Sequence, residues 1–249
     1  MFYIKKFNDD FERSNYIKSN FVSPHLFLES QNKSLSYLEK YKRLDYISST
    51  KTGGQYIDLG CKLLENTDDI RIDIKFNIKD RGKDGKTNNT RQSTLIASQL
   101  ETSPYPGFTL RYRVWDNNYI HLQTKWPFTN SSPVPSESGK WASKYLSINN
   151  EVYDNNIYEF SETLDNIPAS QCNNMNCHLF CALNGSNQPF RFVTADLYYL
   201  ILYKGGHIVR NLIPVQRNSD NEVGLWDMEH QVFYVSQGDQ PFVAGSIIE

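Results

Sequence analysis

The sequence predicts an all-β fold of the sandwich or barrel type, preceded by an N-terminal extension. Apolar and polar residues alternate with period two in several segments, and turn-forming residues separate these segments. Aromatic residues make up 14 % of the chain, with 16 Tyr and 14 Phe, and such residues favour strands. No apolar pattern of helical period and ordinary length follows Lys40. Many short strands separated by turns are typical of a sandwich or a barrel.

Residues 1–40 differ from the rest of the chain. They are polar and aromatic, and no period holds for long, although Ser34 is suited to cap one short helix. A segment without a pattern of its own is suited to ordering on a partner surface. We therefore expect an anchoring arm, residues 1–40, followed by one β domain, residues 41–249. The aromatic side chains expected to bind the partner are Phe2, Tyr3, Phe7, Phe11, Tyr16 and Phe21.

The clearest strand is "IRIDIKFNI" at 70–78, where apolar residues alternate with Arg71, Asp73, Lys75 and Asn77. Successive side chains of a strand point to opposite faces, so one face should be dry and the other wet. "GFTLRYRV" at 107–114 repeats the pattern, and "NYIHLQT" at 118–124 follows as a hairpin partner. Later strands are expected at Tyr145–Ile148, Ile157–Phe160, Cys177–Leu183, Leu197–Tyr203, His207–Ile213, Val223–Trp226 and Val232–Val235. The segment between Trp126 and Lys140 is rich in Pro and Ser and should be a long exposed loop.

Charge and composition exclude several classes of partner. The formal net charge is -2, whereas nucleic-acid binding favours a basic surface. The start, "MFYIKKFNDDFER", lacks the apolar region of a signal peptide, and no run of 18 apolar residues occurs. We expect synthesis in a reducing cytoplasm, no membrane insertion and free thiols at all four cysteines.

Two motifs resemble ligand sites only superficially. "RGKDGKT" at 81–87 follows a strand, but Asp80 stands where a phosphate loop needs its first glycine. Cys172, Cys177, Cys181 and His178 cluster in the sequence. If Cys177 and Cys181 lie on one strand, they are about 13 Å apart and cannot share an ion. We therefore expect no metal and no cofactor.

Carboxylates and tryptophans are the remaining candidates. A sandwich glycosidase needs two carboxyl groups across the scissile bond, and Glu222, Asp227 and Glu229 lie near one another in the sequence. In a turn, however, such residues simply solvate or cap the bend. We expect no catalytic residues. Trp115, Trp126 and Trp141 flank the predicted loops; they are either a carbohydrate-binding set or packing residues of core and loops.

Two terminal blocks carry a resemblance to a known family. "LILYKGGHIVRNLIPVQRNSDNEVGLWDMEHQVFYVSQGDQPFVAG" at 200–245 and "YKRLDYISSTKTGGQYIDLG" at 41–60 resemble the closing and opening segments of concanavalin A-like (LamG-like, jelly-roll) domains of bacteriophage virion structural proteins. "RIDIKFNI", "YLSINNEVY" and "CHLFCALN" fit the strands between them. The resemblance thus covers about residues 41–245, and its terminal blocks are the specific part.

The resemblance implies a two-sheet antiparallel β-sandwich, closed by its first and last segments. In the C-terminal block it implies scaffold roles: a positive-φ turn at Gly205-Gly206, a strand end or edge at Pro214, and backbone capping by Asp227, as by Asp58 in the first block. It further implies a non-enzymatic virion protein, such as a head fibre, capsid decoration or tail-associated component. Its partners would be capsid, portal, neck or tail proteins and other copies of itself. A receptor-binding module for a host glycan is the alternative, and a glycoside hydrolase comes third.

Overall fold

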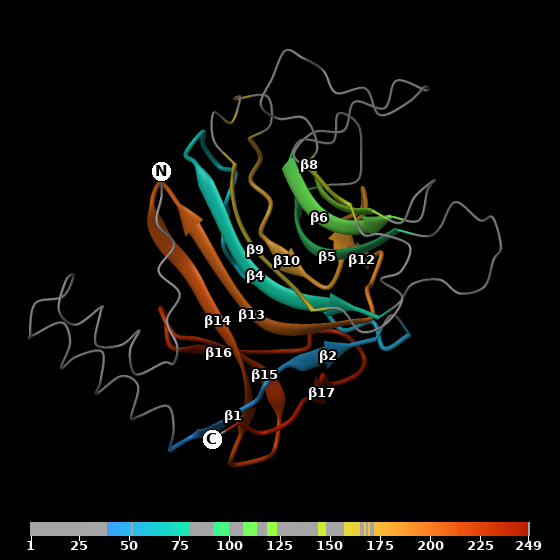
Figure 1. Cartoon of the computed structure of the whole chain (residues 1–249), viewed down its shortest axis with the longest axis vertical. Coiled ribbons are helices and arrows are strands. Elements are labelled where there is room, and N and C mark those ends of the chain that lie inside the picture. Colours follow the sequence, from blue (N-terminus) through green and yellow to red (C-terminus); the bar gives the residue numbers. More distant parts are fainter. Residues whose placement is uncertain are drawn as a thin grey trace, which may run out of the picture. The chain divides into compact units, whose positions relative to one another are not determined.

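The structure is a computed structural model that describes residues 39–50, 52–79, 92–99, 107–113, 119–123, 144–147, 157–164, 167, 169 and 172–248. The chain divides into two compact units, Met1–Tyr41 and Lys42–Glu249, and almost all described residues belong to the second. They form antiparallel strands and turns without an α-helix (Figure 1). The predicted all-β fold is confirmed for this part of the chain. The predicted arm, with its aromatic residues and the helix at Ser34, lies outside the described residues.

The larger sheet has nine strands built around β13 (Ala195–Lys204). β4 (Ile70–Ile78) pairs with β13 along one edge, while β2 (Ile47–Ser49) and β14 (His207–Arg217) share the other edge. The remaining strands are β1 (Tyr41–Arg43), β9 (Tyr158–Leu164), β15 (Val223–Asp227), β16 (Val232–Val235) and β17 (Val243–Ala244). The predicted hairpin turn is confirmed, since Gly205 and Gly206 adopt φ of 54° and 80° between β13 and β14.

The second sheet has six strands in the order β3-β10-β5-β6-β7-β8. They are β3 (Ile57–Asp58), β10 (His178–Leu179), β5 (Gln92–Gln99), β6 (Gly107–Arg113), β7 (Tyr119–Gln123) and β8 (Lys144–Ser147). The predicted hairpin of β6 and β7 is confirmed. A separate pair, β11 (Ala182–Leu183) and β12 (Pro189–Phe190), follows β10.

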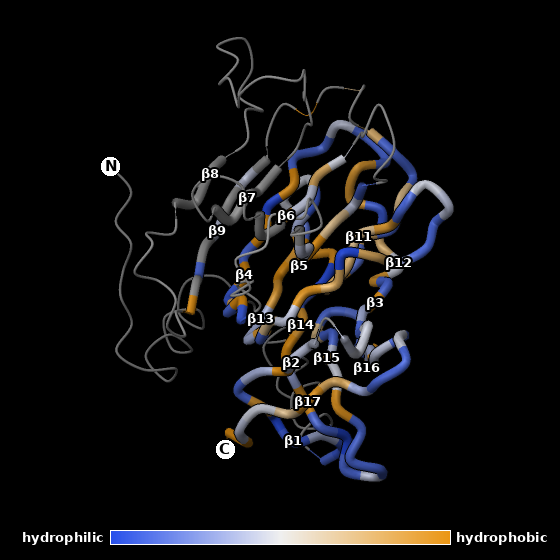
Figure 2. The backbone as a smooth tube through the Cα atoms, turned by 90° about the vertical axis from the view of Figure 1, so that its right-hand side faces the viewer, coloured by the Kyte–Doolittle hydropathy of each residue, from blue (hydrophilic) through white to orange (hydrophobic). Residues whose placement is uncertain are grey.

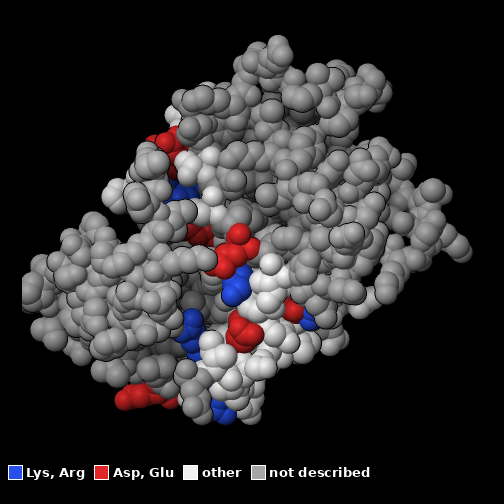
Figure 3. Space-filling view, viewed as in Figure 1, with Lys and Arg blue, Asp and Glu red and all other residues white. Residues whose placement is uncertain are grey.

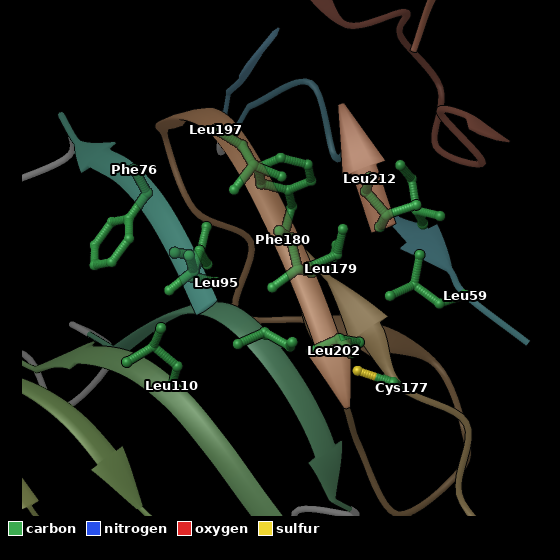
Figure 4. Close-up of a cluster of buried hydrophobic side chains, with 14 of the residues drawn as sticks. Leu59, Phe76, Leu95, Leu110, Cys177, Leu179, Phe180, Leu197, Leu202 and Leu212 are labelled. Atoms are coloured by element: carbon green, nitrogen blue, oxygen red, sulfur yellow. The ribbon is translucent and has the colours of Figure 1, made fainter. Parts of the chain in front are cut away.

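The core lies between these two sheets. Phe76, Leu197 and Leu202 of the larger sheet lie in one cluster with Leu95, Leu110 and Leu179 of the second sheet (Figure 4). Each of these side chains is fully buried, and burying one such side chain stabilises a fold by about 1.5–3 kcal/mol. The apolar strands and polar turns are visible in Figure 2. The described part of the chain is therefore a sandwich-like all-β domain.

Residues 41–60, near the start of the described domain, contact residues 209–245 near its end. We call this contact the closing seam. β2 pairs with β17, with Ile47 opposite Ala244, and the Leu44 amide donates to the Pro214 carbonyl at 3.0 Å. Nearby, the Gln237 amide donates to the Tyr56 carbonyl at 2.9 Å. The expected proximity of residues 41–60 and 209–245 is thus confirmed.

Two predicted details in the strands were wrong. The outer face of β4 is not fully wet, because Asp73 and Asn77 are buried; the Arg71 guanidinium satisfies the Asp73 carboxylate with two hydrogen bonds. The predicted strand Cys177–Leu183 is two strands, because Phe180 adopts a φ of 64°. This breaks the strand after Leu179 and turns the chain from β10 to β11.

Pro214 was also placed wrongly, since it neither ends its strand nor lies on an edge strand. β14 continues through it to Arg217, with Pro214 opposite Leu225 of β15. The ladder between β13 and β14 has already ended at Leu212. The missing N–H of Pro214 therefore interrupts no β13–β14 bond.

Candidate functional site

A polar cavity of about 490 Å³ opens beside the paired strands β3 and β10. The side chains that matter for its chemistry are Tyr56, Asp58, Lys62, Asn176, His178 and Gln237, with Leu183 and Pro189 of the β11–β12 pair adding apolar lining. Carboxylate, amide, phenol and imidazole groups thus converge on one space. In small-molecule pockets, convergent polar groups of this kind orient the ligand and give specificity.

The strand register brings the two central side chains together. Asp58 lies directly opposite His178 in the β3–β10 pair, and directly opposed residues project from the same face of a sheet. The Asp58 carboxylate is then fixed by two donors: the Gly60 amide at 2.8 Å and the Asn176 side-chain amide at 3.0 Å. Gln237 completes this wall, because its side-chain oxygen accepts the Asp58 amide at 3.0 Å. The predicted capping role of Asp58 is confirmed.

The hydrogen bonds of His178 define its proton position. Its Nδ1 lies 2.9 Å from the Asn176 carbonyl oxygen, and a carbonyl only accepts, so Nδ1 carries the proton. Burial lowers the pKa of His178, against the opposing effects of the Asp58 charge and the Asn176 carbonyl. The ring is therefore neutral at pH 7, and Nε2 presents a lone pair.

This arrangement leaves two acceptors facing each other. Nε2 of His178 and Oδ2 of Asp58 are 3.8 Å apart, and at neutral pH no proton lies between them. Such a pair favours a ligand that presents two donors, such as two neighbouring hydroxyl groups, because each hydroxyl has one proton to donate. Burial also raises the pKa of the Tyr56 phenol, helped by nearby Cys181 and Asp58. Tyr56 therefore remains a protonated donor in the same cavity.

A second acidic side chain, Asp227, has quite different surroundings. Its side chain has no exposed surface, and it accepts the amides of Asn211 and Glu229, each at 3.0 Å. His230 Nδ1 lies 2.9 Å from its other oxygen, and Arg210 lies 3.7 Å away. The predicted backbone capping by Asp227 is confirmed. A carboxylate so enclosed cannot reach a glycosidic bond in this structure.

Several predicted site residues lie outside the described residues. They are the carbohydrate candidates Trp115, Trp126 and Trp141, the arm residues Phe2, Tyr3, Phe7, Phe11, Tyr16 and Phe21, and the segment 81–87. Among the described residues, Cys177 and Cys181 lie on either side of the Phe180 break, so the distance argument from a single strand does not apply. The described ranges contain no group of His, Cys, Asp or Glu suited to hold a metal ion.

Charges are mixed on the described surface. In Figure 3, acidic and basic side chains are interspersed over the visible part of the domain. The searched part of the chain also contains no helix long and apolar enough to span a bilayer.

Sequence reasoning missed the cavity. It treated His178 as an ordinary strand residue and assigned no role to Asn176 or Gln237. The available signal was weak: the run "CNNMNCH" at 172–178 places several amides before a histidine. Only the pairing of β10 with β3 brings these residues to Asp58.

Comparisons with known proteins do not assign the chain to a family. No protein-family model matches it, no curated protein matches it in sequence, and no solved structure matches its fold.

Proposed function

We propose that this chain is a non-enzymatic structural protein of a bacteriophage virion. In this proposal residues 41–249 form a concanavalin A-like jelly-roll sandwich that projects outward, and residues 1–40 anchor it. The position would be that of a head fibre, a capsid decoration or a tail-associated component. Its partners would be capsid, portal, neck or tail proteins and further copies of the chain.

The closing seam is the observation that carries the proposal. The two sequence blocks that resemble the virion family are the two segments that pair in the seam. Their residues specify shape: Asp227 caps a turn from inside the domain, and Arg210 donates to the Leu59 carbonyl at 3.0 Å. Residues that only hold two chain ends together suit a scaffold better than an enzyme.

Deletion of residues 1–40 tests the anchoring role. The truncated chain should fold, because the described core and seam lie after residue 40, and it should fail to join particles. Electron microscopy of particles carrying the full or truncated chain would measure position and copy number. Incorporation of the truncated chain at the normal copy number would contradict the proposal.

A carbohydrate-binding module that recognises a host surface glycan is the second candidate. The cavity favours it, because paired acceptors and amide donors match the hydroxyl groups of a sugar residue. In this reading the sandwich still belongs to the virion and gains a receptor role.

A glycan array with the full chain would separate the two candidates. The receptor reading predicts signals that Asp58→Asn reduces at least about tenfold, since a charge-assisted hydrogen bond contributes roughly 1.5–3 kcal/mol. Asp69→Asn is the matched control, because Asp69 is exposed and does not line the cavity. No binding to any bacterial polysaccharide on the array, or an equal loss of binding signal in both variants, would leave only the scaffold role.

A further inference from the structure

Two of the four cysteines face each other beside the cavity. The Cys177 amide donates to the Cys61 carbonyl at 2.8 Å, and the Leu59 amide donates to the Cys177 carbonyl at 2.9 Å. Gly60, with a φ of 61°, turns the chain between Leu59 and Cys61. Cys61 and Cys177 are therefore direct neighbours across two segments that are far apart in the sequence.

Their side chains also influence each other's ionisation. Cys177 is a fully buried member of the core, and Cys61 is partly buried against that core. Interaction with the Cys177 side chain lowers the pKa of Cys61, and the Arg210 charge acts in the same direction against the effect of burial. Burial is the main cause that raises the pKa of Cys177. Cys61 is thus the more exposed and more acidic thiol of the two.

We propose that Cys61 and Cys177 form a thiol–disulfide exchange site, in which Cys61 is the attacking thiol and Cys177 the resolving thiol. The co-reactant is a low-molecular-weight disulfide such as oxidised glutathione. The Cys61 thiolate attacks one sulfur, the S–S bond breaks, and one glutathione thiolate leaves. Cys177 then attacks the Cys61 sulfur and the bond to glutathione breaks, while the Cys177 proton passes to the second glutathione thiolate as it leaves. One disulfide is reduced for each Cys61–Cys177 bond formed.

The other two thiols are suited to serve as controls. Cys181 is buried, and burial raises its pKa to about 12, so it should react slowly. Cys172 is partly buried against the core, and its amide donates to the Ala169 carbonyl at 3.1 Å. The proposal thus predicts that Cys61 pairs with Cys177 and not with Cys181 or Cys172.

The disulfide would lock the cavity wall. Cys61 follows β3 and Cys177 directly precedes β10, so the bond would tie the chain together beside the paired residues Asp58 and His178. It would also close a loop of more than a hundred residues. Closing a loop of that length should raise the melting temperature by roughly 5 °C or more. This inference does not depend on the proposed function.

Mass spectrometry of the full chain tests the exchange. Reduced protein is incubated with oxidised glutathione and then alkylated, and its peptides are mapped. We expect loss of two alkylatable thiols, a Cys61–Cys177 cross-linked peptide and the higher melting temperature. Four alkylatable thiols after incubation, or a bond from Cys61 to Cys172, would overturn the proposal.

Serine variants test the order of the two steps. In Cys177→Ser, Cys61 should stop as a stable mixed disulfide with glutathione, whereas Cys61→Ser should remain unmodified at Cys177. Cys172→Ser should behave as the unchanged protein. Glutathione on Cys177 in Cys61→Ser would reverse the assigned roles and overturn this part. Peptide mapping of the unchanged chain decides the pairing even if a variant fails to fold.

Discussion

Asp58 and Asp227 start from the same local motif and end in opposite roles. Each carboxylate accepts the amide two residues further on, from Gly60 at 2.8 Å and from Glu229 at 3.0 Å. Each also has a histidine nearby, His178 at 3.8 Å and His230 at 2.9 Å. However, the Asp227 side chain has no exposure, whereas that of Asp58 is 34 % exposed.

The difference lies in what the tertiary structure brings to each turn. Asp227 receives a second backbone amide, from Asn211, and the Arg210 guanidinium. Asp58 receives one side-chain amide, from Asn176, and faces a cavity with a neutral imidazole. The Asp227 carboxylate finds its partners within the protein, so it is a structural part of the seam. The Asp58 carboxylate can accept further hydrogen bonds, so it is a candidate ligand contact.

Removing each carboxylate should separate the two roles most strongly. Asp227→Ala leaves two backbone amides without their acceptor and the Arg210 charge without its buried counter-ion, which should reduce the free energy of unfolding by about 3–5 kcal/mol. Asp58→Ala exposes its former donors to solvent and should cost no more than about 1 kcal/mol. Urea unfolding monitored by tryptophan fluorescence measures both. Equal losses would show that the two sites do not differ as the structure implies.

Gly238, next to Gln237, offers a second test of the difference between the two sites. A Cβ at Gly238 would lie 2.0 Å from the Gly54 carbonyl oxygen, so the segment that holds Gln237 against Asp58 must move. Gly238→Ala should cost about 1–3 kcal/mol and weaken the cavity wall. Gly206→Ala is the control, because its Cβ meets nothing and it bears only the cost of a positive φ, about 1–2 kcal/mol.

The readout for the Gly238 change is hydrogen exchange at the Asp58 amide, which donates to Gln237. Exchange there should accelerate in Gly238→Ala and stay unchanged in Gly206→Ala. Unchanged exchange in both variants would mean that Gly238 does not set the position of Gln237.

The sequence predicted strands and turns better than the cavity, for a physical reason. Alternation along β4 and the Gly205-Gly206 turn are local signals, and each specifies a strand or turn without outside help. The cavity depends on register between distant segments, which pairs His178 with Asp58. The break at Phe180 also has no local signal, since a buried Phe at positive φ is stabilised only by tertiary bonds such as Phe180 N to Leu95 O at 2.7 Å.

The smallest expected effect concerns the proton on His178. Burial lowers its pKa in the folded chain, so the unfolded chain takes up the proton first as the pH falls. Stability should therefore decrease below the ordinary histidine pKa of about 6.5 and be unaffected above it. His178→Gln removes this dependence, because glutamine does not titrate, whereas His207→Gln, at the exposed start of β14, should retain it. Urea midpoints between pH 5 and 8 measure the difference between each variant and the unchanged chain. A steeper acid loss in His178→Gln would mean that the folded ring is protonated, and the two acceptors facing the cavity would then be an ion pair.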